Sequence, residues 1–141
     1  MKIVAVDLGQ TRTGLAICDE MEMLASPIGT VTERDTDRLL EKVAAVVRER
    51  GAAHIVVGHP RNMDGSRGES AQRAERFAAD LGERCGVPTS LWDERLTTVS
   101  AIGYLNQTDT RGKKRKAVVD TVSAVIILED YLHNKHSLNE K

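Results

Sequence analysis

The chain has 141 residues, a length typical of one domain, and its 40% hydrophobic and 29% charged residues exclude an intrinsically disordered protein. Its 20 Lys and Arg residues nearly balance its 21 Asp and Glu residues, which excludes nucleic-acid binding through an all-over basic surface. A membrane-spanning helix needs about 18 apolar residues, and no apolar run in this chain is nearly that long. We therefore expect one soluble domain over residues 1–141, without a membrane partner. The start of the chain predicts a core strand and no signal peptide, so we expect a cytoplasmic protein.

Three strands are predicted first. An apolar run over residues 2–8 and a β-prone run over residues 14–18 are joined by a short polar segment, which suits a hairpin. A third strand is predicted over about residues 24–31. Pro27 lacks an amide hydrogen, so this strand is best tolerated at an edge or a bulge.

Helices and strands then alternate. Apolar residues at helical spacing predict a helix over about residues 36–50, before a buried strand at 54–58, a turn-rich loop at 60–68 and a second helix that ends near Gly86. A fifth strand is predicted at 87–92, followed by a helix at 98–105, a polar, basic stretch at 106–116, an apolar helix at 117–132 and a frayed tail at 133–141. This order predicts an α/β domain with a mixed sheet, in which an antiparallel hairpin joins strands connected by helices.

Carboxylates interrupt apolar segments in three places. Asp7 ends the first strand, Asp120 lies in the apolar helix on a face with Ala124 and Ile127, and the pair Asp93-Glu94 follows the fifth strand. Successive strand residues face opposite sides, so one member of this pair can face a site while the other faces away. Taken singly, each carboxylate has a structural explanation: Asp7 could cap a turn, Asp120 could be a first-turn helix residue, and Asp93 could cap the following helix. Together they favour a site for Mg²⁺ or Mn²⁺, which prefer oxygen ligands.

Positive charge is concentrated in one segment. Residues 111–116 carry five positive charges, and without them the net charge of −1 would be −6. A short charged run is often a solvated loop, but this one precedes the helix of Asp120 and would attract a phosphate backbone. Arg12, in the loop after Asp7, is a second candidate phosphate contact. His59 follows a strand at the sheet end where substrates tend to bind, although a single histidine is a weak signal.

Four segments resemble the YqgF/RuvX-type family of Holliday-junction-resolvase-like proteins, described as pre-16S rRNA nucleases. They are Asp7–Ala16, which matches the pattern DxGxxRxGxA, then Val57–Pro60 with Met63–Gly65 and Gly68, then Asp93–Thr98, and finally Asp120–Ala124 with Ile127-Leu128. The resemblance covers nearly the whole chain. Thr13, His59 and Ser123 stand where the family more commonly has Ile, Leu and Ala, and none of these differences removes a carboxylate.

The resemblance implies an RNase H-like fold with a five-stranded mixed sheet flanked by helices. It implies that Asp7, Glu94 and Asp120 are the catalytic acidic triad and hold one or two Mg²⁺ or Mn²⁺ ions, and it favours Glu94 over Asp93, which stays a further candidate ligand. Two such ions can clamp the attacking water and the leaving oxygen of a phosphodiester. The candidate nucleic-acid-binding residues are Arg12, Arg95, Lys113, Lys114, Arg115 and Lys116.

The function that we expect is a metal-dependent nuclease acting on structured RNA, by resemblance the precursor of 16S rRNA near its 5′ end. One alternative is a Holliday-junction resolvase acting on branched DNA, which would need a dimer for symmetric cleavage. Another is a non-catalytic RNA-binding factor in ribosome assembly or transcription. An actin-like or sugar-kinase-like nucleotide-binding protein would need two such domains. We expect a monomer or a weak homodimer.

Overall fold

The structure is a computed structural model that describes residues 1–60, 68–93 and 112–139, with side chains omitted for 112–121 and 136–139. Its elements are β1 (Ile3–Asp7), β2 (Arg12–Cys18), β3 (Ala25–Thr32), α1 (Thr36–Arg50), β4 (His54–His59), α2 (Glu69–Cys85), β5 (Thr89–Asp93) and α4 (Gly112–Asn139). The predicted helix at residues 98–105 lies outside the described residues. None of the described helices is long and apolar enough to span a membrane.

The five strands form one mixed sheet in the order β3-β2-β1-β4-β5. β1 pairs antiparallel with β2, and β2 with β3, whereas β1, β4 and β5 are parallel. The prediction of a mixed sheet is therefore confirmed. Short turns permit antiparallel neighbours, but parallel neighbours require a crossover such as a helix. As Pro27 predicted, β3 lies at an edge, and its pairing with β2 is irregular between Leu15 and Ala16.

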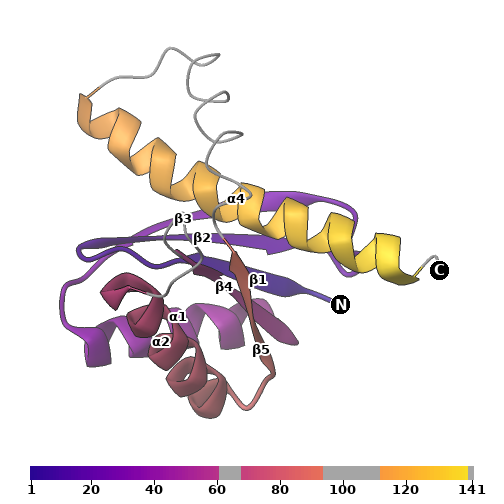
Figure 1. Cartoon of the computed structure of the whole chain (residues 1–141), viewed down its shortest axis with the longest axis horizontal. Helices are drawn as coiled ribbons and strands as arrows, with labels where there is room; N and C mark the ends of the chain where they lie inside the picture. The colour runs from indigo at the N-terminus through magenta and orange to yellow at the C-terminus, as the bar shows by residue number, and fades with distance from the viewer. Residues whose placement is uncertain (61–67, 94–111, 140–141) are drawn as a thin grey trace.

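Helices cover both faces of the sheet (Figure 1), with α1 and α2 on one face and α4 on the other. Strand alternation produces two buried cores. In β1, Val4 and Val6 belong to the core beneath α1 and α2. Ile3 and Ala5 instead pack in the core that contains Ala124, Ile127 and Leu128 of α4. We call these faces the α1/α2 face and the α4 face, since this division decides where each polar side chain lies.

Helix α1 has the predicted bounds because both ends carry capping residues. The Asp35 carboxylate accepts a hydrogen bond from the backbone N–H of Arg38 at 3.0 Å. At the other end Gly51 has a φ of 69°, the left-handed conformation that glycine adopts at helix ends. Five apolar residues of α1 are buried, namely Leu39, Leu40, Val43, Ala44 and Val47. The helix thus fixes one side of the sheet.

Helix α4 is longer than predicted at both ends. It begins at Gly112 and ends at Asn139, so the basic run Lys113–Lys116 is the first part of a helix and not a loop. Lysine and arginine have good helix propensity, which explains how the helix can include them. Within the tail expected at 133–141, the helix continues as far as Asn139. Lys135 Nζ donates a hydrogen bond to Glu22 Oε1 at 2.7 Å and so attaches this end to the turn between β2 and β3.

Two strands begin two residues away from the predicted position, and the other strand boundaries differ by at most one residue. β2 begins at Arg12, two residues earlier than expected, and pairs there with Thr32 of β3. β5 covers Thr89–Asp93 in place of residues 87–92. As a result Arg12 and Asp93 are both held in the sheet, which fixes the face on which each side chain lies.

Candidate active site

The candidate site lies at the carboxyl ends of the three parallel strands, with Asp7 near its centre. Asp7 is the last residue of β1, the middle strand of the sheet. It continues the alternation of Ile3 and Ala5, so its side chain belongs to the α4 face. This is the open end of an α/β sheet, where ligands commonly bind.

The residues beside Asp7 on both neighbouring strands are glycines. Gly14 of β2 is paired directly with Asp7. On the other side, Gly58 of β4 comes one residue beyond the pair Val6–Val57. Glycine has no side chain, so neither strand places one next to the Asp7 carboxylate on the α4 face. Asp7 itself is only partly buried. The neighbouring strands therefore leave the α4 face beside Asp7 without side chains of their own.

Helix α4 brings the position of Asp120 toward the same end of the sheet. The Tyr131 ring stacks 5.8 Å from the ring of His54, the first residue of β4. From there α4 runs back toward the strand ends, as Figure 1 shows. The helix advances about 16 Å from Tyr131 to Asp120, and β4 advances about 13 Å from His54 to Gly58. Asp120 thus lies toward the same end of the sheet as Asp7, one turn before the buried Ala124; the Asp120 side chain lies outside the described residues.

The alternation in β5 separates Asp93 from Asp7. Trp92 packs with the core of the α4 face and is paired with Gly58. Asp93, the next residue, is paired with His59 and belongs to the α1/α2 face. Asp93 therefore lies on the opposite face of the sheet from Asp7. Glu94 and Arg95 lie outside the described residues.

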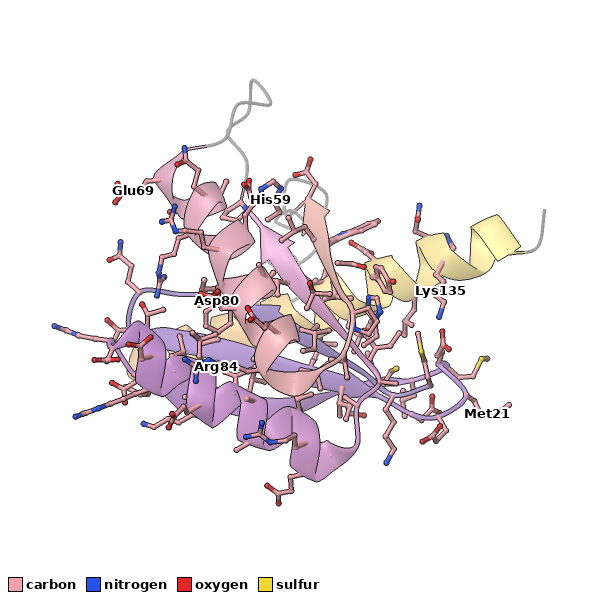
Figure 2. All side chains as sticks on the ribbon, turned by 90° about the horizontal axis from the view of Figure 1, so that it is seen from below. Met21, His59, Glu69, Asp80, Arg84 and Lys135 are labelled. Atoms are coloured by element: carbon pink, nitrogen blue, oxygen red, sulfur yellow. The ribbon has the colours of Figure 1, made fainter. Side chains whose placement is uncertain are left out.

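His59 makes a short polar contact on the α1/α2 face. Its Nε2 lies 2.7 Å from Oε2 of Glu75 in α2, and only 13% of its side chain is exposed. Figure 2 shows His59 at one end of the sheet and Met21 and Lys135 at the other. Since Asp7 belongs to the opposite face, His59 is placed to connect β4 to α2.

The cationic candidates belong to two elements, β2 and α4. Arg12 begins β2 and, by alternation with Ala16 and Cys18, belongs to the α4 face with Asp7. The basic run Lys113–Lys116 forms the first turns of α4, which contain no acidic residue in the first turn. Positive side chains at a helix N-terminus oppose the helix dipole, so helix stability alone does not account for them.

The donor chemistry of this end of the sheet suits a hard cation. In the part of the chain that the structure describes, no group of three His, Cys, Asp or Glu residues could hold a metal ion. Glu94 and the Asp120 side chain are not in that part. The Asp7 carboxylate, beside two glycines and partly accessible, is the kind of oxygen donor that Mg²⁺ and Mn²⁺ prefer.

One contact at this site could not be predicted from the sequence. Arg73 of α2 donates a hydrogen bond from Nη1 to the carbonyl oxygen of Gly9 at 2.9 Å. The two residues are 64 positions apart, and Arg73 and Glu75 look like ordinary polar residues of an amphipathic helix. Their role is indicated only once the fold is known, by their position in the first turns of α2 near the strand ends.

Comparisons with known proteins identify the family. The model of the RuvX family, described as a Holliday junction resolvase, matches residues 1–134. A protein from Shouchella clausii named "Putative pre-16S rRNA nuclease" is 42% identical over 141 residues, covering 98% of this chain and 99% of its own. Proteins of the same name from Geobacillus kaustophilus and Lachnospira eligens are 41% and 39% identical, each covering 96% of this chain and 99% of their own.

Solved structures confirm the RNase H-like fold that the sequence resemblance implied. Thermus thermophilus RuvC aligns with a TM-score of 0.61 at 11% identity, covering 97% of each chain. The fowlpox virus Holliday junction resolvase aligns with a TM-score of 0.57 at 12% identity, covering 95% of this chain and 99% of that one. At such identities the likeness concerns the fold. The sequence matches, which extend over nearly the whole chain, show that this protein belongs to the RuvX family.

Proposed function

We propose that this protein is a divalent-metal-dependent nuclease that hydrolyses a phosphodiester bond of structured RNA, the precursor of 16S rRNA near its 5′ end. The observation that carries the proposal is the placement of Asp7, a carboxylate at the centre of the open sheet end between Gly14 and Gly58. The name shared by the relatives supports the choice of substrate.

Asp7, Glu94 and Asp120 would hold one or two Mg²⁺ or Mn²⁺ ions. Asp7 belongs to the α4 face, and Asp120 would join it there from α4, one turn before Ala124, which is buried on that face. We choose Glu94 over Asp93 because strand alternation puts Asp93 on the other face. When bound, the metal supplies an activated water and neutralises charge on the scissile phosphate.

The protein's own cations would orient the substrate. Arg12 lies on the same face as Asp7, so it is placed to contact a phosphate next to the scissile bond. The positive charges at the start of α4 would hold the phosphate backbone further along, and Arg95 would add to them. Such contacts position the nucleic acid without reading its sequence. Recognition would therefore depend on the shape of the RNA.

A Holliday-junction resolvase is the second candidate, supported by the description of the matching family model. The same acidic residues would cut branched DNA. Symmetric cleavage of a four-way junction would require a dimer, whereas cleavage of an RNA end requires one subunit. Substrate preference and oligomeric state therefore distinguish the two functions. A non-catalytic RNA-binding factor would bind RNA whether or not the carboxylates are present.

The test compares a precursor 16S rRNA fragment with a four-way DNA junction, each with Mg²⁺ and with a chelator. We expect cleavage of the RNA by the parent protein, loss of cleavage with the chelator, and loss of cleavage but not of binding in Asp7→Asn. Asp80→Asn, an equal change at an exposed residue of α2, is the matched control and should cleave normally. Cleavage of the junction alone would favour the resolvase. Equal cleavage by Asp7→Asn and parent would refute the metal site.

A further inference from the structure

The loop after β1 is held from the opposite face of the sheet by a side chain that is not part of the proposed metal site. Arg73 of α2 reaches the sheet end and donates a hydrogen bond from Nη1 to Gly9 O at 2.9 Å, in a partly buried position. Gly9 comes two residues after Asp7. The contact therefore joins α2 to the short segment that must present the Asp7 carboxylate.

This segment has little freedom to move without disturbing Asp7. A Cβ atom on Gly9 would lie 2.0 Å from the carbonyl oxygen of Arg12, so the turn is too tight for any side chain there. On its far side, the backbone N–H of Glu33 donates a hydrogen bond to Thr11 O at 2.8 Å. Arg73 of α2 and Glu33, which directly follows β3, thus hold the loop from two different segments of the chain.

Helix α2 is itself fixed at the same level of the sheet. Glu75, two residues after Arg73, contacts the His59 ring at 2.7 Å. The next turns bury Phe77 and Leu81 in the core beneath the sheet. Arg73 therefore extends from a rigid helix, and its guanidinium can act as a fixed anchor for the loop.

We propose that Arg73 is a positioning residue that acts through the Gly9 carbonyl to hold Asp7 in the geometry required for metal binding. The inference rests on the proposed function, because it assigns the metal to Asp7. A charged guanidinium forms a stronger hydrogen bond to a carbonyl than a neutral donor does. Groups that orient metal ligands commonly change metal affinity by about 10- to 100-fold when they are replaced.

The experiment measures Mn²⁺ affinity by calorimetry, and kcat and KM separately, for Arg73→Gln, Arg73→Lys and the parent protein. Arg73→Gln should weaken Mn²⁺ binding by about tenfold. It should also lower kcat at limiting metal while leaving KM for RNA unchanged. Arg73→Lys, which keeps a charged donor, should recover part of the Mn²⁺ affinity and part of kcat. Arg76→Gln removes the same charge three residues later at an exposed position of α2, and it should bind Mn²⁺ like the parent.

The outcomes distinguish a failure of the positioning role of Arg73 from a failure of the proposed metal site. Unchanged Mn²⁺ affinity in Arg73→Gln would overturn the positioning role. A lower melting temperature with equal losses in the glutamine and lysine variants would also overturn it, since this would show a merely structural contact. Asp7→Asn is the reference: if it binds Mn²⁺ as tightly as the parent, the proposed metal site is wrong, whatever Arg73 does.

Discussion

A carboxylate lies near each end of β1, Glu22 at the amino end and Asp7 at the carboxyl end, and the two carboxylates have different surroundings. At the amino end of β1, the Met1 ammonium and Lys135 both contact the Glu22 carboxylate, at 3.0 and 2.7 Å. These contacts hold the pKa of Glu22 at about 2, with the Lys135 hydrogen bond as the main cause. At the carboxyl end, Asp7 lies between two glycines and belongs to the α4 face, as Arg12 does.

This difference distinguishes a carboxylate that stabilises the fold from one that we propose binds a ligand. Glu22 is matched by cations of the same chain, so its charge contributes to folding. Asp7 is the carboxylate that we propose as a metal ligand, and the residues beside it on both neighbouring strands are glycines. A carboxylate that contributes to a ligand site is commonly less favourable for folding than one paired within the protein. The following predictions test this contrast, beginning with the largest expected effect.

The largest effect should follow from loosening α4. Ile127→Ala and Leu39→Ala each remove a fully buried side chain, from α4 on the α4 face and from α1 on the α1/α2 face respectively. Both should lower the free energy of unfolding by about 2–5 kcal/mol. Only Ile127→Ala should also weaken Mn²⁺ binding, because α4 positions Asp120. Denaturant unfolding and calorimetry measure the two quantities. Equal metal affinities would contradict the role assigned to α4.

Gly9→Ala should distort the site end of the sheet. The added Cβ would lie 2.0 Å from a backbone oxygen, so the loop must shift, at a cost of about 1–3 kcal/mol. Metal affinity should fall with the stability. Gly51→Ala, at a left-handed helix end where the Cβ meets nothing within 4 Å, should cost about 1–2 kcal/mol and leave metal binding unchanged. Metal binding by Gly9→Ala at the parent's affinity would show that this turn does not position Asp7.

Glu22→Gln should reduce stability at neutral pH and leave nuclease activity unchanged. The folded-state pKa of Glu22 is lowered from 4.5 to about 2, so its stabilising contribution is present above pH 4.5 and is lost as the pH falls toward 2. Because its partners are partly exposed to solvent, we expect a loss of about 1–2 kcal/mol. Thermal melts of parent and variant should differ at pH 7 and converge near pH 2. A difference independent of pH would contradict this explanation.

The smallest effect should appear in the salt dependence of RNA binding. Arg12→Gln should weaken binding and reduce the slope of log K against log salt by about one, as expected for one lost phosphate contact. Lys135→Gln removes the same charge at the amino end, where Lys135 pairs with Glu22, and should leave the slope unchanged. Filter binding at several salt concentrations gives both slopes. Equal slopes for the two variants would refute the phosphate contact of Arg12.

Much of the fold was predictable because its signals are local. Helical spacing predicted the bounds of α1, which Asp35 and Gly51 cap in the structure, and Pro27 predicted an edge strand. The length of α4 was not predictable from apolar spacing. Its basic start has helix propensity without apolar residues, and its end is attached by Lys135 to Glu22, 113 residues away.

The sequence by itself determined the succession of strands and helices and the unusual position of Asp7 in an apolar strand, since both follow from neighbouring residues. Only the tertiary structure decided which face each side chain occupies. Register and alternation place Asp93 opposite Asp7, set Gly14 and Gly58 beside it, and bring Arg73 to Gly9. These relations depend on contacts between segments far apart in the chain, which local periodicity does not encode.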